Sequence, residues 1–420
     1  MKNAFRALRT RNYRLFFTGQ LVSLMGTWMQ IVAQAWLVLE LGGGGLEIGI
    51  LTALQFGPTL LGGVWGGLLA DRLPKRKILL VTQVLFAVLA TGLATLTASG
   101  AVELWMVYAF AFVYGSVQVA DIPARQAFVS EMVRRDDVMN AVSLNSAIFN
   151  AARMVGPAVA GLLIAGASLA LCFYINAASY IAVLLALTLM RDRELHVDHE
   201  RPERGKGQIR EGMRYVRADP QLWMPIVLMG IVSMLGLNFQ IVLPLLAKFT
   251  YGGGPTTFGT LTAVLAFGSL LGALFAGTRK RASMKLLVGA AVAFGALEIV
   301  AALAPSLGTA YVALGALGVA SMLYIATSNS AIQLNASPQM RGRAMSLFVL
   351  VLLGSTPIGG PLVGWIAETW SPRAALGVGG VASLAAALVA GAFLAGRRRG
   401  ERQAPAPVPI PEEVLAAEAS

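Results

Sequence analysis

Acidic and basic side chains stand close together in the stretch GGLLADRLPKRK, which covers residues 66–77. Asp71 and Arg72 follow an apolar run, and Lys75 and Arg76 come just after a proline. A carboxylate at the end of a membrane helix is costly unless a partner stabilises it, so it is a candidate functional group. The alternative is a short loop whose cations only set the membrane topology.

A polar stripe runs along the first apolar segment. Its members are separated by 3, 4, 3 and 4 residues, which places them on one face of a helix. The stripe consists of Gln20, Ser23, Thr27, Gln30 and Gln34. We predict that this face lines a cavity and contacts a substrate. Hydrogen bonding to neighbouring helices is the alternative, because Ser, Thr and Gln form such bonds in membranes.

Further polar side chains lie singly within other apolar runs and are candidates for the same cavity. They are Tyr114, Gln118, Asn145, Asn150, Asn238 and Asn329. Tyr114 and Gln118 lie one helical turn apart. Each residue taken alone is more typical of a packing hydrogen bond, so only their convergence would indicate a binding site.

Several charged residues lie inside or near the apolar runs. Asp121 and Arg125 are four residues apart and are expected to pair along one helix face. Arg153 is expected to face protein or water rather than lipid. A buried carboxyl group can carry a proton, which makes Asp121 and Glu298 candidate proton carriers.

The composition indicates which kind of protein positions these residues. Of 420 residues, 56% are hydrophobic and only 13% are charged. Soluble domains have about 25% charged residues, so this chain is predicted to be an integral membrane protein. The net charge of +12 would favour nucleic acid in a soluble protein, but here the basic residues cluster in short loops, which indicates membrane topology instead.

The residue types offer little for catalysis or metal binding. The two histidines, His196 and His199, lie in one polar stretch without further ligands, so we expect a solvated linker there rather than a metal site. Cys172 is the only cysteine, which excludes an intramolecular disulfide and a cysteine metal site. We find no nucleotide-binding loop and no catalytic constellation, so we expect neither an enzyme nor a cofactor.

Twelve apolar runs are long enough to cross a bilayer, which requires about 20 residues each. They are predicted to be helices, because an open strand cannot satisfy its backbone in lipid. The runs cover residues 15–41, 46–70, 78–99, 103–126, 138–165, 169–190, 222–248, 256–278, 284–304, 307–332, 342–367 and 373–395. The expected fold class is therefore an all-α integral membrane protein.

The distribution of Lys and Arg predicts the orientation. Alternate connections, with both chain ends, contain 30 of the 33 basic residues, and the connections between them contain only Lys248 and Arg373. Cytosolic loops carry the excess of Lys and Arg, so both termini are predicted to be cytosolic in a cell membrane.

The runs fall into two sets of six, residues 1–190 and 222–396. Between them, residues 191–221 form a polar linker in which Ile209, Met213 and Val216 indicate an amphipathic helix. Residues 397–420 are predicted to be a disordered tail. The halves resemble each other weakly: AVSL at 141–144 recurs as AMSL at 344–347. Parallel six-helix repeats are typical of transporters that work by alternating access.

The motifs resemble those of the major facilitator superfamily. Residues 66–77 resemble the family's signature between its second and third helices, although Pro74 stands where the family has Gly. The stretches at 11–38, 121–128 and 145–163 are similar to the branch of drug-efflux proteins and enterobactin exporters. The resemblance covers about residues 5–396, and Gly156, Pro157 and Gly161 resemble the antiporter signature of helix five.

This resemblance implies two pseudo-symmetric six-helix bundles around a cavity that opens alternately to each side. It also implies a gating network at the cytosolic side, with Asp71 latching the first half to the start of helix eleven. The residues that match it are Asp71, Arg72, Lys75, Arg76, Asp121 and Arg125. The expected function is export of a small amphiphilic molecule, a drug-like compound or a siderophore, by proton antiport.

Energy coupling and cargo have alternatives. The Arg that many proton-coupled relatives carry in helix four is replaced by Ala111, which departs from the usual proton relay. A lipid or lysolipid flippase of the same fold is the alternative function, because amphiphiles suit a cavity rich in Met and Trp. We expect the partners to be a small molecule, protons and membrane lipids but no nucleic acid, and we expect a monomer.

Overall fold

The computed structural model describes residues 5–196, 208–277, 283–337 and 339–403. These residues form helices and no strand. The first half contains α1 (Arg11–Glu40), α2 (Gly45–Arg72), α3 (Lys75–Ala98), α4 (Leu104–Met132), α5 (Val138–Gly166) and α6 (Leu169–Thr188). The second half contains α8 (Pro220–Leu235), α9 (Phe239–Leu245), α10 (Pro255–Gly277), α11 (Met284–Ala302), α12 (Leu307–Asn335), α13 (Arg341–Gly354), α14 (Thr356–Thr369) and α15 (Pro372–Gln403).

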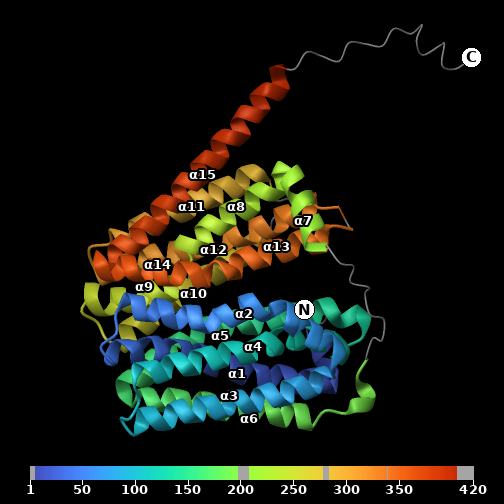
Figure 1. Ribbon diagram of the computed structural model, residues 1–420, viewed down its shortest axis with the longest axis vertical. Helices are drawn as coiled ribbons and strands as arrows, with labels where there is room; N and C mark the ends of the chain where they lie inside the picture. Colours follow the sequence, from blue (N-terminus) through green and yellow to red (C-terminus); the bar gives the residue numbers. More distant parts are fainter. Residues whose placement is uncertain (1–4, 197–207, 278–282, 338, 404–420) are drawn as a thin grey trace, which may run out of the picture.

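The helices of each half pack into their own bundle, and Figure 1 shows the two bundles one above the other. Eleven spans in the described residues are long and apolar enough to cross a membrane, and the bent α2 is the twelfth if it counts as one span. The twelve predicted runs therefore correspond to these spans. In lipid the bundles are held together by close packing and interhelical hydrogen bonds rather than by a hydrophobic driving force.

Two predicted spans are interrupted. The run at 222–248 becomes α8, α9 and a π-helical turn at Leu246–Thr250. Gly236 is a poor helix former, and the side chain of Asn238 donates to the carbonyl of Met234 at 2.7 Å, replacing a backbone donor. The run at 342–367 is divided at Ser355 into α13 and α14, where Pro357 lacks the N–H that a continuous helix needs.

Outside the spans, part of the linker and the start of the tail are also α-helical. In the linker, α7 (Gln208–Ala218) is the amphipathic helix, with Val216 buried against the second bundle. At the other end, α15 continues to Gln403, so the first seven residues of the predicted disordered tail are helical. Arg, Glu and Gln are good helix formers, and the first proline comes only at position 405. The rest of the tail lies outside the described residues.

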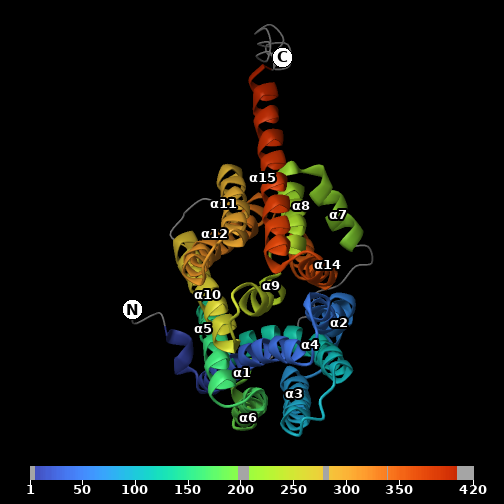
Figure 2. The same ribbon diagram turned by 90° about the vertical axis from the view of Figure 1, so that its left-hand side faces the viewer.

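The two halves meet through two pairs of helices, α2 with α14 and α5 with α10. Figure 2 shows both pairs where the bundles join. We call the end of the bundle where α2 ends and α3 begins, at residues 71–77, the basic end. The end where α2 begins, near Gly45, is the opposite end.

Candidate functional site

A cavity of about 2130 Å³ lies between the two halves. Helices α1, α2, α4 and α5 form one wall, and residues of α7, α9 and α13 form the other. Trp28, Phe149 and Leu350 belong to its apolar surface. The cavity extends to Arg214 and Arg343, which lie at the basic end, so this is the end from which it is reached.

At the opposite end, α2 and α14 approach each other through glycines. A Cβ atom on Gly49 would lie 2.6 Å from the carbonyl oxygen of Gly360 and 2.7 Å from Cα of Pro361. Gly45 and Gly364 contact each other in the same way one turn further out. Small residues allow helix backbones to pack this closely, so the cavity is closed at this end.

The motif Gly156-Pro157 with Gly161 lies at the second contact between the halves. A Cβ atom on Gly161 would lie 2.8 Å from the carbonyl oxygen of Pro255, and one on Gly259 would lie 2.5 Å from that of Pro157. Gly156 instead packs against α1, with Trp28 Cβ at 2.6 Å from its Cβ position. The motif thus permits close packing of α5 with both α1 and α10.

Two polar contacts to the end of α1 and the start of α2 also join the halves at the opposite end. Lys248 Nζ donates to the carbonyl oxygen of Leu39 at 2.7 Å. The backbone N–H of Leu46 donates to Glu368 Oε2 at 2.9 Å, which satisfies a free donor at the start of α2. We refer to these contacts, together with the glycine contacts between α2 and α14 and between α5 and α10, as the seal.

The polar stripe of α1 is divided between two environments. Gln20 and Thr27 line the cavity. Ser23, Gln30 and Gln34 do not line it, and Gln30 accepts a hydrogen bond from Asn176 of α6, although Gln20 is itself largely buried. Both interpretations of the stripe therefore apply to different residues, and substrate contact remains a prediction for the two that face the cavity.

The other polar candidates are divided in a similar way. Those that line the cavity are Tyr114, Gln118, Asn145 and Asn238. Asn150 instead donates to the carbonyl oxygen of Ser146 at 2.8 Å, and Asn329 accepts from Gln333 at 2.5 Å. Gln240, two residues after Asn238, lines the cavity as well, and so do Thr52 and Gln55 of α2, although their sequence context did not mark those two.

Asp121 and Arg125 form the expected ion pair on α4. Asp121 is fully buried, and its Oδ1 accepts from Thr82 Oγ1 at 2.7 Å and from Gln83 Nε2 at 3.0 Å. Arg125 also donates from Nη1 to Gln20 Oε1 at 3.2 Å, and it lines the cavity. The acid is therefore covered, and the cation is presented to the cavity.

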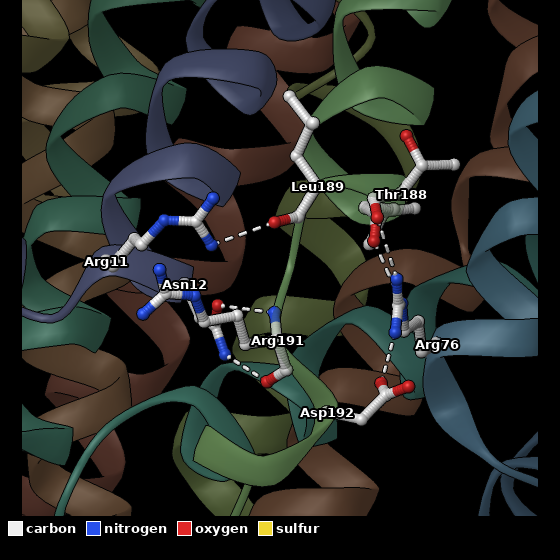
Figure 3. A network of polar contacts seen from close by, with 8 residues as sticks. Arg11, Asn12, Arg76, Thr188, Leu189, Arg191 and Asp192 are labelled. Atoms are coloured by element: carbon white, nitrogen blue, oxygen red, sulfur yellow. Dashed lines mark hydrogen bonds and ion pairs between the residues drawn. The ribbon is translucent and has the colours of Figure 1, made fainter.

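The basic motif forms contacts within the first half. Arg76 donates from Nε to the carbonyl oxygen of Leu187 at 2.8 Å and from Nη2 to that of Thr188 at 3.2 Å, and it pairs with Asp192. Figure 3 shows this contact beside the one from Arg11 to Leu189. Cations at the last carbonyls of a helix satisfy free acceptors and interact favourably with the helix dipole, so both arginines stabilise the end of α6.

The remaining residues of the predicted gating network lie at the same end. Lys75 Nζ pairs with Glu131 Oε1 at 2.6 Å, which joins the start of α3 to the end of α4. The resemblance grouped Lys75 with Asp121, but the acid that contacts it is Glu131, because Asp121 lies deeper in α4. Asp71 and Arg72 are exposed at the end of α2, and the latch to the second half remains a prediction.

Arg153 and Glu298 occupy two further buried positions. Arg153 Nη2 donates to Ser269 Oγ of α10 at 3.3 Å, across the contact between the halves. Glu298 is buried in the second bundle, away from the cavity. Its Oε2 atom has no hydrogen-bond partner in the described part of the chain.

The basic residues at the mouth of the cavity were missed by the sequence reasoning. Arg214 and Arg217 of α7 and Arg343 of α13 all line it. Glu211 pairs with Arg343 at 2.7 Å and the Tyr215 hydroxyl accepts from the backbone N–H of Ser337 at 2.9 Å, so α7 is fixed to the second half. The amphipathic pattern of the linker was the only signal in the sequence for these residues.

Within the described ranges, no three His, Cys, Asp or Glu residues are grouped as metal ligands. His199 lies outside those ranges.

Sequence comparison relates the chain to transporters. Residues 2–418 match the family described as transmembrane secretion effector, MFS_3. The chain is 26% identical to multidrug efflux pump Tap of Mycolicibacterium fortuitum, over 84% of this chain and 88% of the relative. It is 23% identical to enterobactin exporter EntS of Salmonella choleraesuis over 88% of each chain.

Other relatives match over a shorter length. The chain is 25% identical to the staphyloferrin A transporter of Staphylococcus aureus over 62% of this chain. That match spans 66% of the staphyloferrin A transporter. A separate match spans 64% of the transporter YfiS of Bacillus subtilis. These names are those of transporters rather than enzymes.

Solved structures show the same fold. A bacterial homolog of the lysosomal transporter Spinster has a TM-score of 0.71 at 17% identity, covering 94% of this chain and 99% of that one. The nucleoside transporter NupG has a TM-score of 0.71 at 14% identity, covering 92% and 99%. With the family match over nearly the whole sequence, the chain belongs to the transmembrane secretion effector family of the major facilitator superfamily.

Proposed function

We propose that this protein is a secondary transporter that exports a small amphiphilic molecule from the cytosol by alternating access. The observation that carries the proposal is the cavity between the two halves, which is reached from the basic end and sealed at the opposite end. The excess of Lys and Arg assigns the basic end, with both termini, to the cytosol. This conformation then corresponds to the state that accepts cargo before export.

The seal supports alternating access because it consists of contacts that can separate. Its glycines pack by shape alone, and the two polar bonds across it end on backbone groups that water can satisfy after opening. The names of the relatives support export of drugs or siderophores as the direction and the class of cargo. They do not favour a lipid flippase.

We propose proton exchange as the driving reaction, with Asp121 and Glu298 as the two candidate carriers. Their surroundings differ. Asp121 is paired with Arg125 and accepts two further hydrogen bonds, so it is stabilised as an anion. Glu298 has an unpartnered carboxyl oxygen in a buried site, where the neutral form avoids the cost of an isolated charge.

The test uses purified protein in liposomes that contain a pH-sensitive dye. Ethidium, enterobactin and staphyloferrin A serve as probes of different charge. We expect at least one of them to accumulate in the liposomes against its own gradient when a proton gradient is imposed. The dye should report protons moving across the membrane in the opposite direction. Absence of transport for the whole set, in protein that remains folded, would refute the proposal.

Two substitutions test the two candidate proton carriers. Asp121→Asn and Glu298→Gln keep the side-chain shape and remove the exchangeable proton. The one that carries the proton is expected to retain exchange of labelled for unlabelled cargo while losing accumulation driven by the gradient. Unchanged gradient-driven accumulation in both variants would show that neither is the coupling site.

A further inference from the structure

The charges on the cavity wall are of one sign. Among the described residues that line it, four are arginines and none is an acid. These are Arg125 in its interior and Arg214, Arg217 and Arg343 near its mouth. Asp121 is the nearest acid to Arg125, but it is fully buried behind the wall. A cationic cargo would therefore find no counter-charge on this surface.

Arg125 retains hydrogen-bonding capacity that its protein partners do not use. A guanidinium group has five N–H donors. Asp121 and Gln20 each accept one bond, and Nε is buried without a partner. The side chain is 27% exposed, and this exposed part lines the cavity. Thr82 and Gln83 both donate to Oδ1 of Asp121, and Arg125 bonds Oδ2 through Nη2 only, so Arg125 can keep this pair and offer its unused N–H groups to a second anion.

The surface around Arg125 is suited to an apolar body attached to that anion. Phe86 packs against Tyr114 and Tyr180, with ring centroids 4.8 and 5.5 Å apart, and these three largely buried rings form the backing of the cavity wall. On the neighbouring wall, Trp28 and Phe149 meet edge to face at 5.7 Å. Rings of this kind bury large apolar area at specific geometry.

The mouth adds an electrostatic bias. Arg214 and Arg217 are exposed on α7, while Arg343 is paired with Glu211. A charged rim raises the local concentration of ions of the opposite sign and loses this effect at high salt. Anions are therefore attracted at the rim and can be bound by Arg125 inside.

We propose that the cavity binds amphiphilic anions, whose carboxylate or similar group is held by Arg125 and whose apolar part lies against the aromatic side chains. This deepens the proposed function and rests on it, because it names the class of cargo for the same cavity. The membrane potential, negative inside, favours outward movement of such an anion. A free amphiphile and an anionic lipid share this chemistry, and we commit to the free amphiphile.

The test compares two probes that differ only in charge: dansyl-labelled undecanoic acid and the trimethylammonium compound of the same chain length. Fluorescence titration of the purified protein is expected to give at least roughly tenfold tighter binding of the acid, since a charge-assisted bond contributes about one tenfold step or more. Tighter or equal binding of the cation would overturn the proposal.

A double variant locates the anion. Asp121→Asn with Arg125→Gln removes both charges and leaves no buried carboxylate unpaired. We expect it to bind the acid roughly 10- to 100-fold more weakly and to bind the neutral methyl ester almost unchanged. The matched control is Arg191→Gln with Glu194→Gln, which removes another Arg–acid pair that does not line the cavity. Equal loss for acid and ester in the double variant would indicate damage to the cavity rather than loss of an anion site.

Transport in liposomes separates the possible failures. Export of ethidium without export of the dansyl acid would leave the proposed function intact and refute the anion preference. No export of any probe would refute the proposed function itself. Movement of a fluorescent phosphatidylglycerol between leaflets, without movement of the dansyl acid, would show that the cargo is a lipid and would overturn the choice made here.

Discussion

The seal at the opposite end and the basic motif at the basic end connect different parts of the molecule. The seal joins the two halves, and it does so mainly through glycines whose backbones touch, such as Gly49 and Gly360. The described contacts of Lys75 and Arg76 stay within the first half, where they bind the ends of α4 and α6. In this conformation, therefore, shape holds the halves together and charge stabilises the end of one half.

This difference has a physical reason. Backbone packing between glycines is short in range and is lost as soon as two helices separate, so it can form and break during a transport cycle. An arginine that binds helix carbonyls stabilises a helix terminus whether or not the halves move. Substitutions in the two regions should consequently affect different measurements, conformation in one case and stability in the other.

The largest effect is expected for Gly49→Leu. Its Cβ would meet backbone atoms of Gly360 and Pro361, which cannot rotate away. Overpacking of this kind costs about 1–3 kcal/mol, enough to shift a two-state equilibrium roughly 5- to 150-fold toward the state open at the opposite end. Transport should fall in proportion.

The measurement is labelling of Thr52→Cys, a cavity position on the same helix, with a membrane-impermeant maleimide added to intact cells. The buried Cys172 is replaced by Ser beforehand. Labelling should rise in Gly49→Leu but not in Gly57→Leu, because a Cβ on Gly57 meets nothing within 4 Å. Equal labelling in the two variants would show that the glycine contact does not close the cavity.

A smaller effect, on stability alone, is expected for Arg76→Gln. The change removes two hydrogen bonds to carbonyls at the end of α6, and we expect a loss of about 1–3 kcal/mol in the free energy of unfolding. Thermal unfolding in detergent measures it, with the exposed Lys77→Gln as control. Increased Thr52→Cys labelling in the Arg76 variant would contradict the separation of roles between the two regions.

The polar part of the seal should contribute less than its glycines. Lys248→Met removes the bond from Nζ to the carbonyl oxygen of Leu39. We expect a few-fold increase in Thr52→Cys labelling, because the freed carbonyl can bind water near the membrane surface. The control is Lys285→Met, an exposed lysine at the start of α11. No increase would show that the bond from Lys248 to Leu39 does not contribute to the seal.

The smallest effect is expected for Asp71→Asn, which examines the predicted latch at the cytosolic end. The latch would form only when that end closes, so the variant should show reduced transport, a few-fold at most, with normal membrane insertion. Lys77→Gln provides the control for loss of charge at the same turn, because Lys77 is exposed and lies outside the predicted gating network. Normal transport by the Asp71 variant in liposomes would refute the latch.

Much of the fold could be predicted because it depends on neighbours along the chain. A run of about 20 apolar residues identifies a membrane helix without knowledge of its surroundings. The ion pair of Asp121 with Arg125 follows from a spacing of four residues on one helix. The interruptions at Gly236 and Ser355 were missed, because Gly and Pro are tolerated in many membrane helices and only packing decides where one breaks.

The candidate site was predictable only in part. The spacing of the polar residues on α1 predicts a stripe on one face, but spacing cannot say whether a neighbouring helix covers that face. Asn176 of α6 covers Gln30 and leaves Gln20 and Thr27 for the cavity. The choice of Glu131 over Asp121 as the partner of Lys75 likewise depends on how α3 and α4 lie against each other.

The sequence by itself determined the membrane class, the twelve apolar runs, the excess of basic residues on one side and the local ion pair on α4. The tertiary structure alone decided which end is sealed, which polar residues face the cavity, and that the charges on its wall are arginines. The physical reason is the separation along the chain of the residues that interact. Hydropathy and helical periodicity act between residues that are close in the chain, whereas a cavity and its seal arise from contacts between helices that are far apart in the chain.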